Sequence, residues 1–283
     1  MSELQSEVEE RIERVDKQFF QDVFLAALVA GFLVAMHYGL SADVKALLAF
    51  DHEAFRPWTL VTSAYVHTDG VHLWNNVQGF LLAAGLVYGL CWRLGKRSWF
   101  RWTLPVFLLV LPVLVNLTSY LVLGWLSPSS SPTGRGFSSV AAGFVGFVFT
   151  AFLMWVADMT SRNIAVYVGQ LITVVLVWEL SLIYKGFDVL VVGLVGFVFL
   201  LIGVGIFRET TPGQRRFDWR DHFPTLYFAS VIVGLLAAFI VLLFPADFIK
   251  GEVATNIFAH AAGLIYGAVI AYTTHRHSWS SDT

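Results

Sequence analysis

Long apolar stretches, separated by short polar or charged segments, recur along the 283-residue chain. A helix needs about 20 predominantly apolar residues to cross the hydrocarbon layer of a bilayer. Eight stretches approach or exceed this length and predict membrane-spanning helices over 23–40, 72–92, 102–126, 138–157, 164–184, 189–207, 225–244 and 253–274. The strict alternation of apolar and polar residues that marks a membrane β-barrel is missing. The sequence therefore predicts an all-α fold, a polytopic bundle of membrane helices.

The segment before the first span has a helical pattern of its own. Apolar residues from Val8 to Phe19 recur at spacings of three and four, and acidic and basic residues form i,i+4 pairs between them. This pattern predicts a short amphipathic helix at the membrane surface. The chain therefore divides into an amphipathic cytoplasmic segment over 1–22, a membrane domain over 23–274 and a cytoplasmic tail over 275–283.

Composition supports a membrane protein and excludes several other classes. Apolar residues make up 57% of the chain and charged residues 13%, whereas soluble domains carry about 25% charged residues. Proteins that bind nucleic acid usually carry an excess of basic residues. The net charge here is −2, so we expect no nucleic-acid partner. The single cysteine, Cys91, excludes an intramolecular disulfide and any cysteine-based metal or redox motif. We expect neither a metal nor a cofactor.

Lys and Arg residues near the ends of the spans predict how the chain crosses the membrane, because cytoplasmic loops carry an excess of them. With the N-terminus in the cytoplasm, thirteen of the 18 Lys and Arg residues fall on the cytoplasmic side and five outside. We therefore expect an integral protein of the cell membrane with both termini in the cytoplasm. The segments 41–71 and 127–137 then face outward.

Four titratable residues fall inside the predicted spans, where such residues are costly and usually functional. They are His37, His72, Glu179 and His260. We interpret His37 as an interfacial residue near the outer end of the first span. Glu179 has no evident partner in the sequence, and a structural carboxyl is the simplest interpretation.

Two polar residues share a face at the start of the second predicted span. His72 and Asn76 are four residues apart, so both lie on one side of the helix near its outer end. Two hydrogen-bond donors in this place could stabilise an oxyanion, although this segment alone favours interfacial histidines that cap the span. A metal site with His67 is disfavoured, because His67 and His72 would not share a helix face and no carboxylate or cysteine completes a ligand set.

Ser138 opens the fourth predicted span directly after a loop rich in Ser, Pro and Gly. A serine at this position is commonly a helix cap. It could instead be a nucleophile at a helix N-terminus, where free backbone N–H groups also stabilise an oxyanion. Gly136 fits both interpretations, because glycine permits the sharp turn that leads into the helix.

His260 lies in the last predicted span, on one face with Gly263 and Gly267. Small residues let the backbone of a neighbouring membrane helix approach closely, and the span that Ser138 opens carries a similar stripe ending at Gly146. By parity both spans run from the outer to the inner side. We therefore expect the two faces to pack together and to bring His260 within hydrogen-bond distance of Ser138.

Three blocks of this sequence together resemble the rhomboid family of intramembrane serine proteases. Their residues, in chain order, are His67-x4-His72-x3-Asn76, Gly136-Phe137-Ser138-Ser139 and His260-x2-Gly263-x3-Gly267. They are similar to the motifs that open the second and fourth core helices of the family and to its histidine helix.

The resemblance implies a role for each residue of the site. Ser138 would be the nucleophile and His260 the general base and acid, with His72 and Asn76 as oxyanion donors. It also implies that the partners are the lipid bilayer and membrane-protein substrates with a single transmembrane helix, cleaved in or next to that helix near the outer membrane face. The active site would lie towards the outer face of the membrane.

Some positions depart from the family pattern. Ser139 replaces the usual glycine, and Ala142 replaces an aromatic ring that often stacks on the catalytic histidine, so His260 must be oriented in another way. The family has a six-helix core with one helix between serine and histidine, whereas three are predicted here. We therefore expect an insertion of two helices within 160–250, and the sequence leaves open which of the three is the family's fifth helix.

These observations predict an intramembrane serine endopeptidase that uses a Ser-His dyad. One alternative is a catalytically silent rhomboid-fold protein that binds membrane proteins or serves their quality control. Another is a transporter in which Glu179 couples transport to an ion. The substrate and the oligomeric state are not predicted by the sequence.

Overall fold

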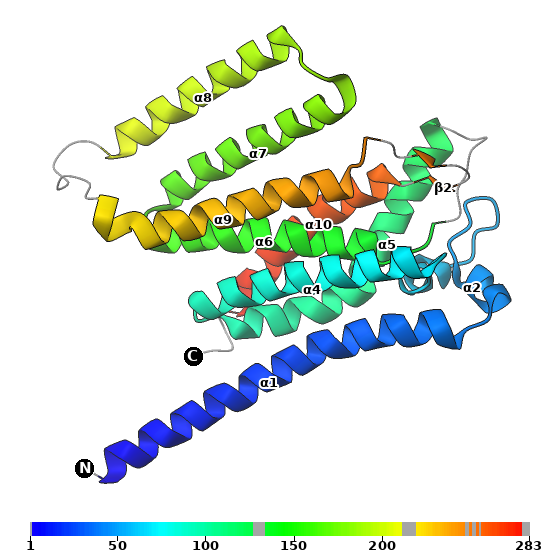
Figure 1. Ribbon diagram of the computed structural model, residues 1–283, viewed down its shortest axis with the longest axis horizontal. Coiled ribbons are helices and arrows are strands. Elements are labelled where there is room, and N and C mark those ends of the chain that lie inside the picture. The colour runs from blue at the N-terminus through cyan, green and yellow to red at the C-terminus, as the bar shows by residue number, and fades with distance from the viewer. Residues whose placement is uncertain are drawn as a thin grey trace.

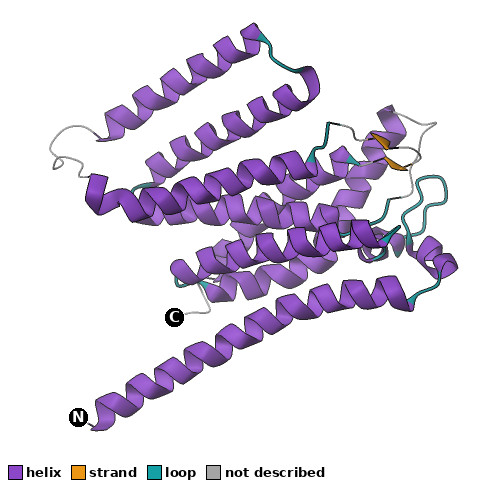
Figure 2. Cartoon of the chain, viewed as in Figure 1, coloured by secondary structure: helices purple, strands orange, loops and turns teal. Residues whose placement is uncertain are grey.

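A computed structural model describes residues 2–126, 134–210, 219–246, 249–250, 253–254 and 256–278. Each of the eight predicted spans forms a long helix, and the helices run roughly side by side (Figures 1 and 2). The long helices are α1 (Ser2–Gly39), α4 (Gly70–Arg93), α5 (Arg97–Leu126), α6 (Ser138–Met159), α7 (Arg162–Lys185), α8 (Val189–Thr210), α9 (Trp219–Leu243) and α10 (Ile257–Ser278). The prediction of an all-α polytopic bundle is confirmed.

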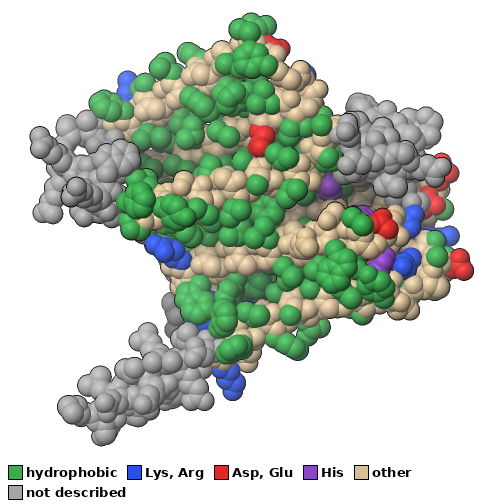
Figure 3. Space-filling view, viewed as in Figure 1, with side chains coloured by type: hydrophobic (Ala, Val, Ile, Leu, Met, Phe, Trp, Pro, Cys, Tyr) green, Lys and Arg blue, Asp and Glu red, His purple; other side chains and the backbone are tan. Residues whose placement is uncertain are grey.

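Seven of the long helices are long and apolar enough to cross a membrane, as expected of an integral membrane protein. The eighth, α4, has sufficient length with 24 residues, but polar residues in its first turns, among them His72 and Asn76, lower its hydropathy. It packs against α1, α5 and α6, so its polar start lies within the bundle. On the face drawn in Figure 3, hydrophobic side chains cover most of the length of the helices, and most charged side chains gather near their two ends.

Several helices begin at other residues than the sequence predicted; α5 and α9, for example, begin five and six residues earlier than expected. The segment over 1–22, predicted as a short amphipathic helix, is helical and forms the first part of α1, which continues without a break to Gly39. The side chains before Lys17 lie outside the description. The last span begins at Ile257 and not at 253, because the Asn256 side chain accepts the N–H of Ala259 at 3.0 Å and caps the helix.

Short elements occupy the loops at one end of the bundle. The segment before α10 contains two paired two-residue strands, β1 (Ile249–Lys250) and β2 (Val253–Ala254). Part of the predicted loop over 127–137 lies outside the described residues, as does most of the tail over 275–283.

Helix α6 is the central helix of the bundle, and it makes its most extensive contact with α10. The two backbones approach so closely that a Cβ atom added at Gly146 would lie 2.1 Å from the carbonyl oxygen of Leu264. A Cβ atom at Gly263 would lie 2.2 Å from the carbonyl oxygen of Ser139. The predicted small-residue faces therefore do meet, and only glycine fits at these crossing points. Gly143, which the sequence analysis did not include, lies in the same contact, against Gly267.

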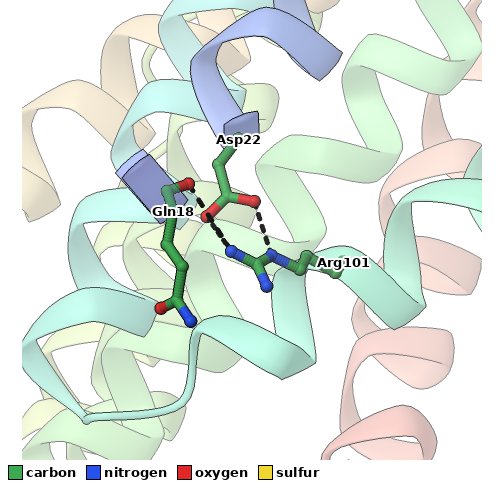
Figure 4. A network of polar contacts seen from close by, with 3 residues as sticks. All are labelled: Gln18, Asp22 and Arg101. Carbon is green, nitrogen blue, oxygen red and sulfur yellow. Dashed lines mark hydrogen bonds and ion pairs between the residues drawn. The ribbon is translucent and has the colours of Figure 1, made fainter. Parts of the chain in front are cut away.

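An ion pair between the half-buried Arg101 and the buried Asp22 attaches α1 to α5. The Asp22 carboxylate accepts hydrogen bonds from Arg101 Nε at 2.6 Å and Nη2 at 3.0 Å, and the Gln18 carbonyl oxygen lies 3.5 Å from Nη2 (Figure 4). Asp22 is only 2% exposed, so the bidentate contact compensates a carboxylate that lies within the protein. The predicted first span begins at residue 23, and the sequence analysis therefore left Asp22 outside it.

The segment between α1 and α4 folds into short helices that the sequence analysis did not predict. They are α2 (Ala42–Leu48), α3 (Thr59–Thr62) and the 3-10 helix η1 (Ser63–Tyr65). Asn116 of α5 donates hydrogen bonds to the carbonyl oxygen of Leu60 and to Ser63 Oγ, at 2.8 and 2.9 Å. Phe50 forms an isolated β-bridge with Gly134. Internal partners of this kind allow non-helical backbone to lie against membrane helices.

Helices α7 and α8 form a hairpin at the periphery. Helix α8 packs on α7, and α7 contacts α6 and α9. In Figure 1 the hairpin lies at the top of the bundle and α1 at the bottom. The start of α1 and the end of α10 lie toward the same end of the molecule, which we call the basal end. The starts of α4, α6 and α10 and the end of α9 lie at the opposite end.

Candidate active site

Ser138 and His260 meet at the end of the bundle opposite the basal end. Ser138 is the first residue of α6 and His260 lies in the first turn of α10. Because α6 and α10 run in the same direction, their first turns lie side by side. The distance from Ser138 Oγ to His260 Nε2 is 2.8 Å, a hydrogen bond.

The second ring nitrogen of His260 contacts the main chain of α9. His260 Nδ1 lies 2.6 Å from the carbonyl oxygen of Leu243. A carbonyl oxygen only accepts hydrogen bonds, so Nδ1 must carry the proton. In the neutral ring Nε2 then has a free lone pair, which accepts the Ser138 hydroxyl. The main chain of α9 thus fixes the tautomer that a general base requires, in a side chain that is 7% exposed.

The end of α9 explains why this carbonyl is available. Leu243 is the last residue of the helix, and the final carbonyl groups of a helix have no partner within it. The ring of Phe244, the next residue, packs edge-on against His260, with 6.4 Å between the ring centroids. The end of one helix therefore both orients and shields the histidine of another.

His72 and Asn76 face the turn that precedes Ser138. Gly136 has a φ angle of +118°, and a Cβ atom at this position would lie 2.7 Å from His72 Nε2 and 3.3 Å from Asn76 Nδ2. Asn76 is 6% exposed, and its Nδ2 has no hydrogen-bond partner among the described residues. A buried donor without an acceptor is costly. Such a donor is suited to an oxygen that arrives with a substrate.

Hydrogen bonds from two main-chain N–H groups hold this turn. The N–H of Gly136 donates to the carbonyl oxygen of Ser63 at 2.9 Å, and the N–H of Phe137 donates to His67 Nε2 at 3.4 Å. Burial, reinforced by the nearby His72 and His37, lowers the pKa of His67 to about 3. His67 is therefore neutral at physiological pH, which leaves its Nε2 able to accept.

A second chain of hydrogen bonds positions His72. The Thr68 hydroxyl donates to Asp69 Oδ2 at 2.8 Å and lies 3.3 Å from His72 Nδ1. Since the single hydroxyl proton goes to the carboxylate, the Thr68 oxygen accepts from Nδ1–H. Neutral His72 then has an unprotonated Nε2, and it donates from Nε2 only when the ring carries a second proton.

The other titratable residues from the sequence analysis do not join the dyad. The ring of His37 lies 6.4 Å from that of His67. Glu179 lies on α7, and its Oε2 is buried without a hydrogen-bond partner in the described part of the chain. No group of three or more His, Cys, Asp or Glu residues that could hold a metal ion occurs within the described ranges.

Sequence reasoning did not find the carbonyl oxygens of Leu243 and Ser63, nor the Thr68 and Asp69 side chains beside His72. The two carbonyl oxygens are main-chain atoms, so no residue type marks them. Gly136 did carry a signal, because a glycine two residues before a helix-opening serine indicates a sharp turn.

The site thus joins a serine, a tautomerically fixed histidine and two further polar side chains at one end of a membrane helix bundle. In comparisons with known proteins, the chain matches no protein-family model, no curated protein and no solved structure.

Proposed function

We propose that this chain is an intramembrane serine endopeptidase of the rhomboid type, with Ser138 as the nucleophile and His260 as the general base. The observation that carries the proposal is the hydrogen-bond series from Ser138 Oγ to His260 Nε2 and from His260 Nδ1 to the Leu243 carbonyl oxygen, at 2.8 and 2.6 Å. A nucleophile, a base and a group that orients the base are the three parts of a serine-hydrolase site.

In the first half of the reaction, Ser138 Oγ attacks the scissile carbonyl carbon while its proton moves to His260 Nε2. The imidazolium that forms keeps its Nδ1–H bond to the Leu243 carbonyl oxygen. It then gives the Nε2 proton to the leaving amine as the C–N bond breaks, which leaves an acyl ester on Ser138. Water attacks this ester with the same proton relay and releases the acid product.

The tetrahedral oxyanion is stabilised by donors that converge on the start of α6. The Ser138 N–H, in the first turn of the helix, has no intrahelical acceptor, and Asn76 Nδ2 is buried without a partner. His72 adds a third donor in its imidazolium form, with the positive charge that best matches an oxyanion. Loss of one such donor typically lowers the rate by about 10²–10³.

The arrangement of the helices also supports a rhomboid type of core. Helix α9 ends against His260 and contacts α6, so we assign it the place of the family's fifth helix. The α7–α8 hairpin is then the inserted pair. Ala142 stands where the family often has an aromatic ring that stacks on the histidine. In this chain the Leu243 carbonyl oxygen orients His260 instead.

We further propose the location and the substrates. The excess of Lys and Arg near the basal end supports a cytoplasmic position for that end in a cell-membrane protein, with the dyad towards the outer face. Substrates are then membrane proteins whose transmembrane helix presents a peptide bond in or next to the outer leaflet.

The test compares Ser138→Ala with Ser139→Ala, the adjacent hydroxyl, in proteoliposomes that contain a single-span reporter protein. We expect Ser138→Ala and His260→Ala to abolish cleavage and fluorophosphonate labelling, and Ser139→Ala to retain both. Unchanged reporter cleavage by folded Ser138→Ala would refute the proposal. A folded wild-type protein that neither cleaves the reporter nor reacts with the probe would favour the non-proteolytic binding protein.

A further inference from the structure

A groove opens between α4 and α9 in the basal half of the bundle, well below the dyad. It has a volume of about 370 Å³ and is lined by Gly85, Leu86, Gly89, Leu90, Trp92, Arg93, Phe228 and Ile232. The volume lies within the range of small-molecule binding sites, about 300–1,000 Å³. The lining is apolar except at one end, where the only charged residue of the groove, Arg93, is the last residue of α4.

Two glycines keep the α4 side of the groove open. Gly85 and Gly89 are four residues apart and so lie on one face of the helix. A Cβ atom added at either position would meet no atom within 4 Å. On this side the groove is therefore lined by the main chain of α4. A larger side chain at either glycine would occupy the groove without a clash.

Arg93 is held at the mouth of the groove by two aromatic rings. Its guanidinium carbon lies 5.6 Å from the centre of the Trp155 ring and 5.2 Å from that of Phe228. It forms no ion pair with any residue in the part of the chain that the structure describes. Aromatic contacts engage the face of a guanidinium, which leaves N–H groups at its edge for a bidentate anion such as a phosphate.

We infer that this groove binds one anionic phospholipid of the basal leaflet, with its phosphate on Arg93 and an acyl chain along Gly89 and Gly85. The charged end of the groove lies at the helix end, where lipid phosphates reside, and the apolar part runs toward the middle of the membrane. This is the polarity of a phospholipid. From Gly85 to Arg93 the groove follows about 12 Å of α4, too short for a second transmembrane helix to pack along its length.

The test measures lipid retained by the full-length protein and does not depend on peptidase activity. The protein is purified in mild detergent with equimolar phosphatidylglycerol and phosphatidylcholine of the same acyl chains, and native mass spectrometry counts the bound lipids. We expect one retained phosphatidylglycerol per chain. Arg93→Gln should lower its retention about fivefold, the effect of one arginine near a membrane surface, and Gly89→Leu should remove it.

Two matched variants control for general effects. Arg162→Gln removes a cation at the same end of the bundle, on α7, away from the groove. Gly234→Leu adds the same bulk on α9 two residues beyond Ile232, about 200° around the helix, where a Cβ atom also meets nothing within 4 Å. Both should retain phosphatidylglycerol as the wild type does.

Three results would overturn the inference. The first is equal retention of the two lipids, and the second is wild-type retention by Arg93→Gln and Gly89→Leu. The third is a loss in Arg162→Gln as large as in Arg93→Gln, which would indicate surface charge alone. Monodisperse elution of every variant in size-exclusion chromatography separates lost binding from lost fold.

Discussion

His260 Nδ1 lies 2.6 Å from the Leu243 carbonyl oxygen, a main-chain atom 17 residues earlier in the chain and on a different helix. The geometry of the dyad therefore depends on where α9 ends relative to α10. In serine hydrolases with a full triad, a carboxylate performs this orienting role. Here a neutral carbonyl performs it, so His260 gains an orientation without a buried negative charge.

The protonation of His260 provides the first prediction. We expect ¹⁵N NMR of histidine-labelled protein at neutral pH to find the His260 ring protonated on Nδ1, because the Leu243 carbonyl can only accept. The His260→Gln variant identifies the signal, and Ser138→Ala should leave the Nδ1 proton in place. A ring protonated on Nε2 instead would contradict the proposed base.

Gly136→Ala should inactivate the site while leaving the bundle folded. The added Cβ atom would lie 2.6 Å from His72 Cε1 and 2.7 Å from its Nε2, at a φ angle that favours glycine. Displacement of His72 should lower kcat/KM by about 10²–10³, the usual effect of losing one oxyanion donor. Gly134→Ala is the matched control, because its Cβ atom would make an ordinary 3.7 Å contact with Phe50. Similar kinetics for the two variants would argue against this role of the turn.

Asn76→Ala should lower kcat by about 10²–10³ with little change in KM, because an oxyanion donor acts mainly in the transition state. The neighbouring Asn75 is exposed, so Asn75→Ala should retain wild-type kinetics. Reporter cleavage at several substrate concentrations separates kcat from KM. An effect of Asn76→Ala on KM alone would assign the residue to substrate binding.

Gly146→Ala should destabilise the protein by about 1–3 kcal/mol or more, since the added methyl group overlaps main-chain atoms of α10. The crossing of α6 and α10 also sets the Ser138–His260 distance, so activity should fall with stability. Gly196→Ala on α8 meets no atom within 4 Å and should be neutral or slightly stabilising. Thermal unfolding in detergent measures both, and equal midpoints would be inconsistent with a tight crossing.

Asp69 makes the stability of the α4 start depend on pH. Its carboxylate accepts the N–H of His72 and the Thr68 hydroxyl, and these hydrogen bonds lower the pKa of Asp69. A lowered pKa in the folded state means that the contribution is present above the unfolded pKa of about 3.9. It is lost as the pH falls through the folded value. Asp69→Ala should therefore cost about 0.5–2 kcal/mol at pH 7, as lost helix caps do.

Thermal unfolding of wild type and Asp69→Ala at several pH values tests this linkage. The difference between the two proteins should shrink below pH about 4. A difference that stays constant down to pH 3 would mean that Asp69 does not act as an ionised cap.

The eight long helices could be predicted because each contains a long run of predominantly apolar residues, which a helix within a bilayer needs whether it faces lipid or other helices. The meeting of Ser138 and His260 could be predicted because close packing in a membrane requires small residues, and Gly146, Gly263 and Gly267 mark that contact. Apolar runs and small residues are properties of side chains, and the sequence gives the identity of every side chain.

Other features were not predictable from residue types. The Leu243 and Ser63 carbonyls act through the backbone, which every residue shares. The short helices α3 and η1, of four and three residues, are too short to show an apolar period. They are held by contacts with α5 and with the turn before α6. Asp22 was left out of the first span because a charged residue normally ends an apolar run, whereas Arg101, far away in sequence, compensates this charge.

The α7–α8 hairpin has a consequence for how the chain tolerates change. It leaves the bundle at the basal end after α6 and returns there before α9, so it adds two crossings without reversing any later helix. No side chain of the hairpin hydrogen-bonds to Ser138 or His260 within the described residues. We therefore expect the hairpin to be dispensable for the fold: a chain in which a flexible connection joins the end of α6 to the start of α9 would keep every helix of the candidate site in its present direction.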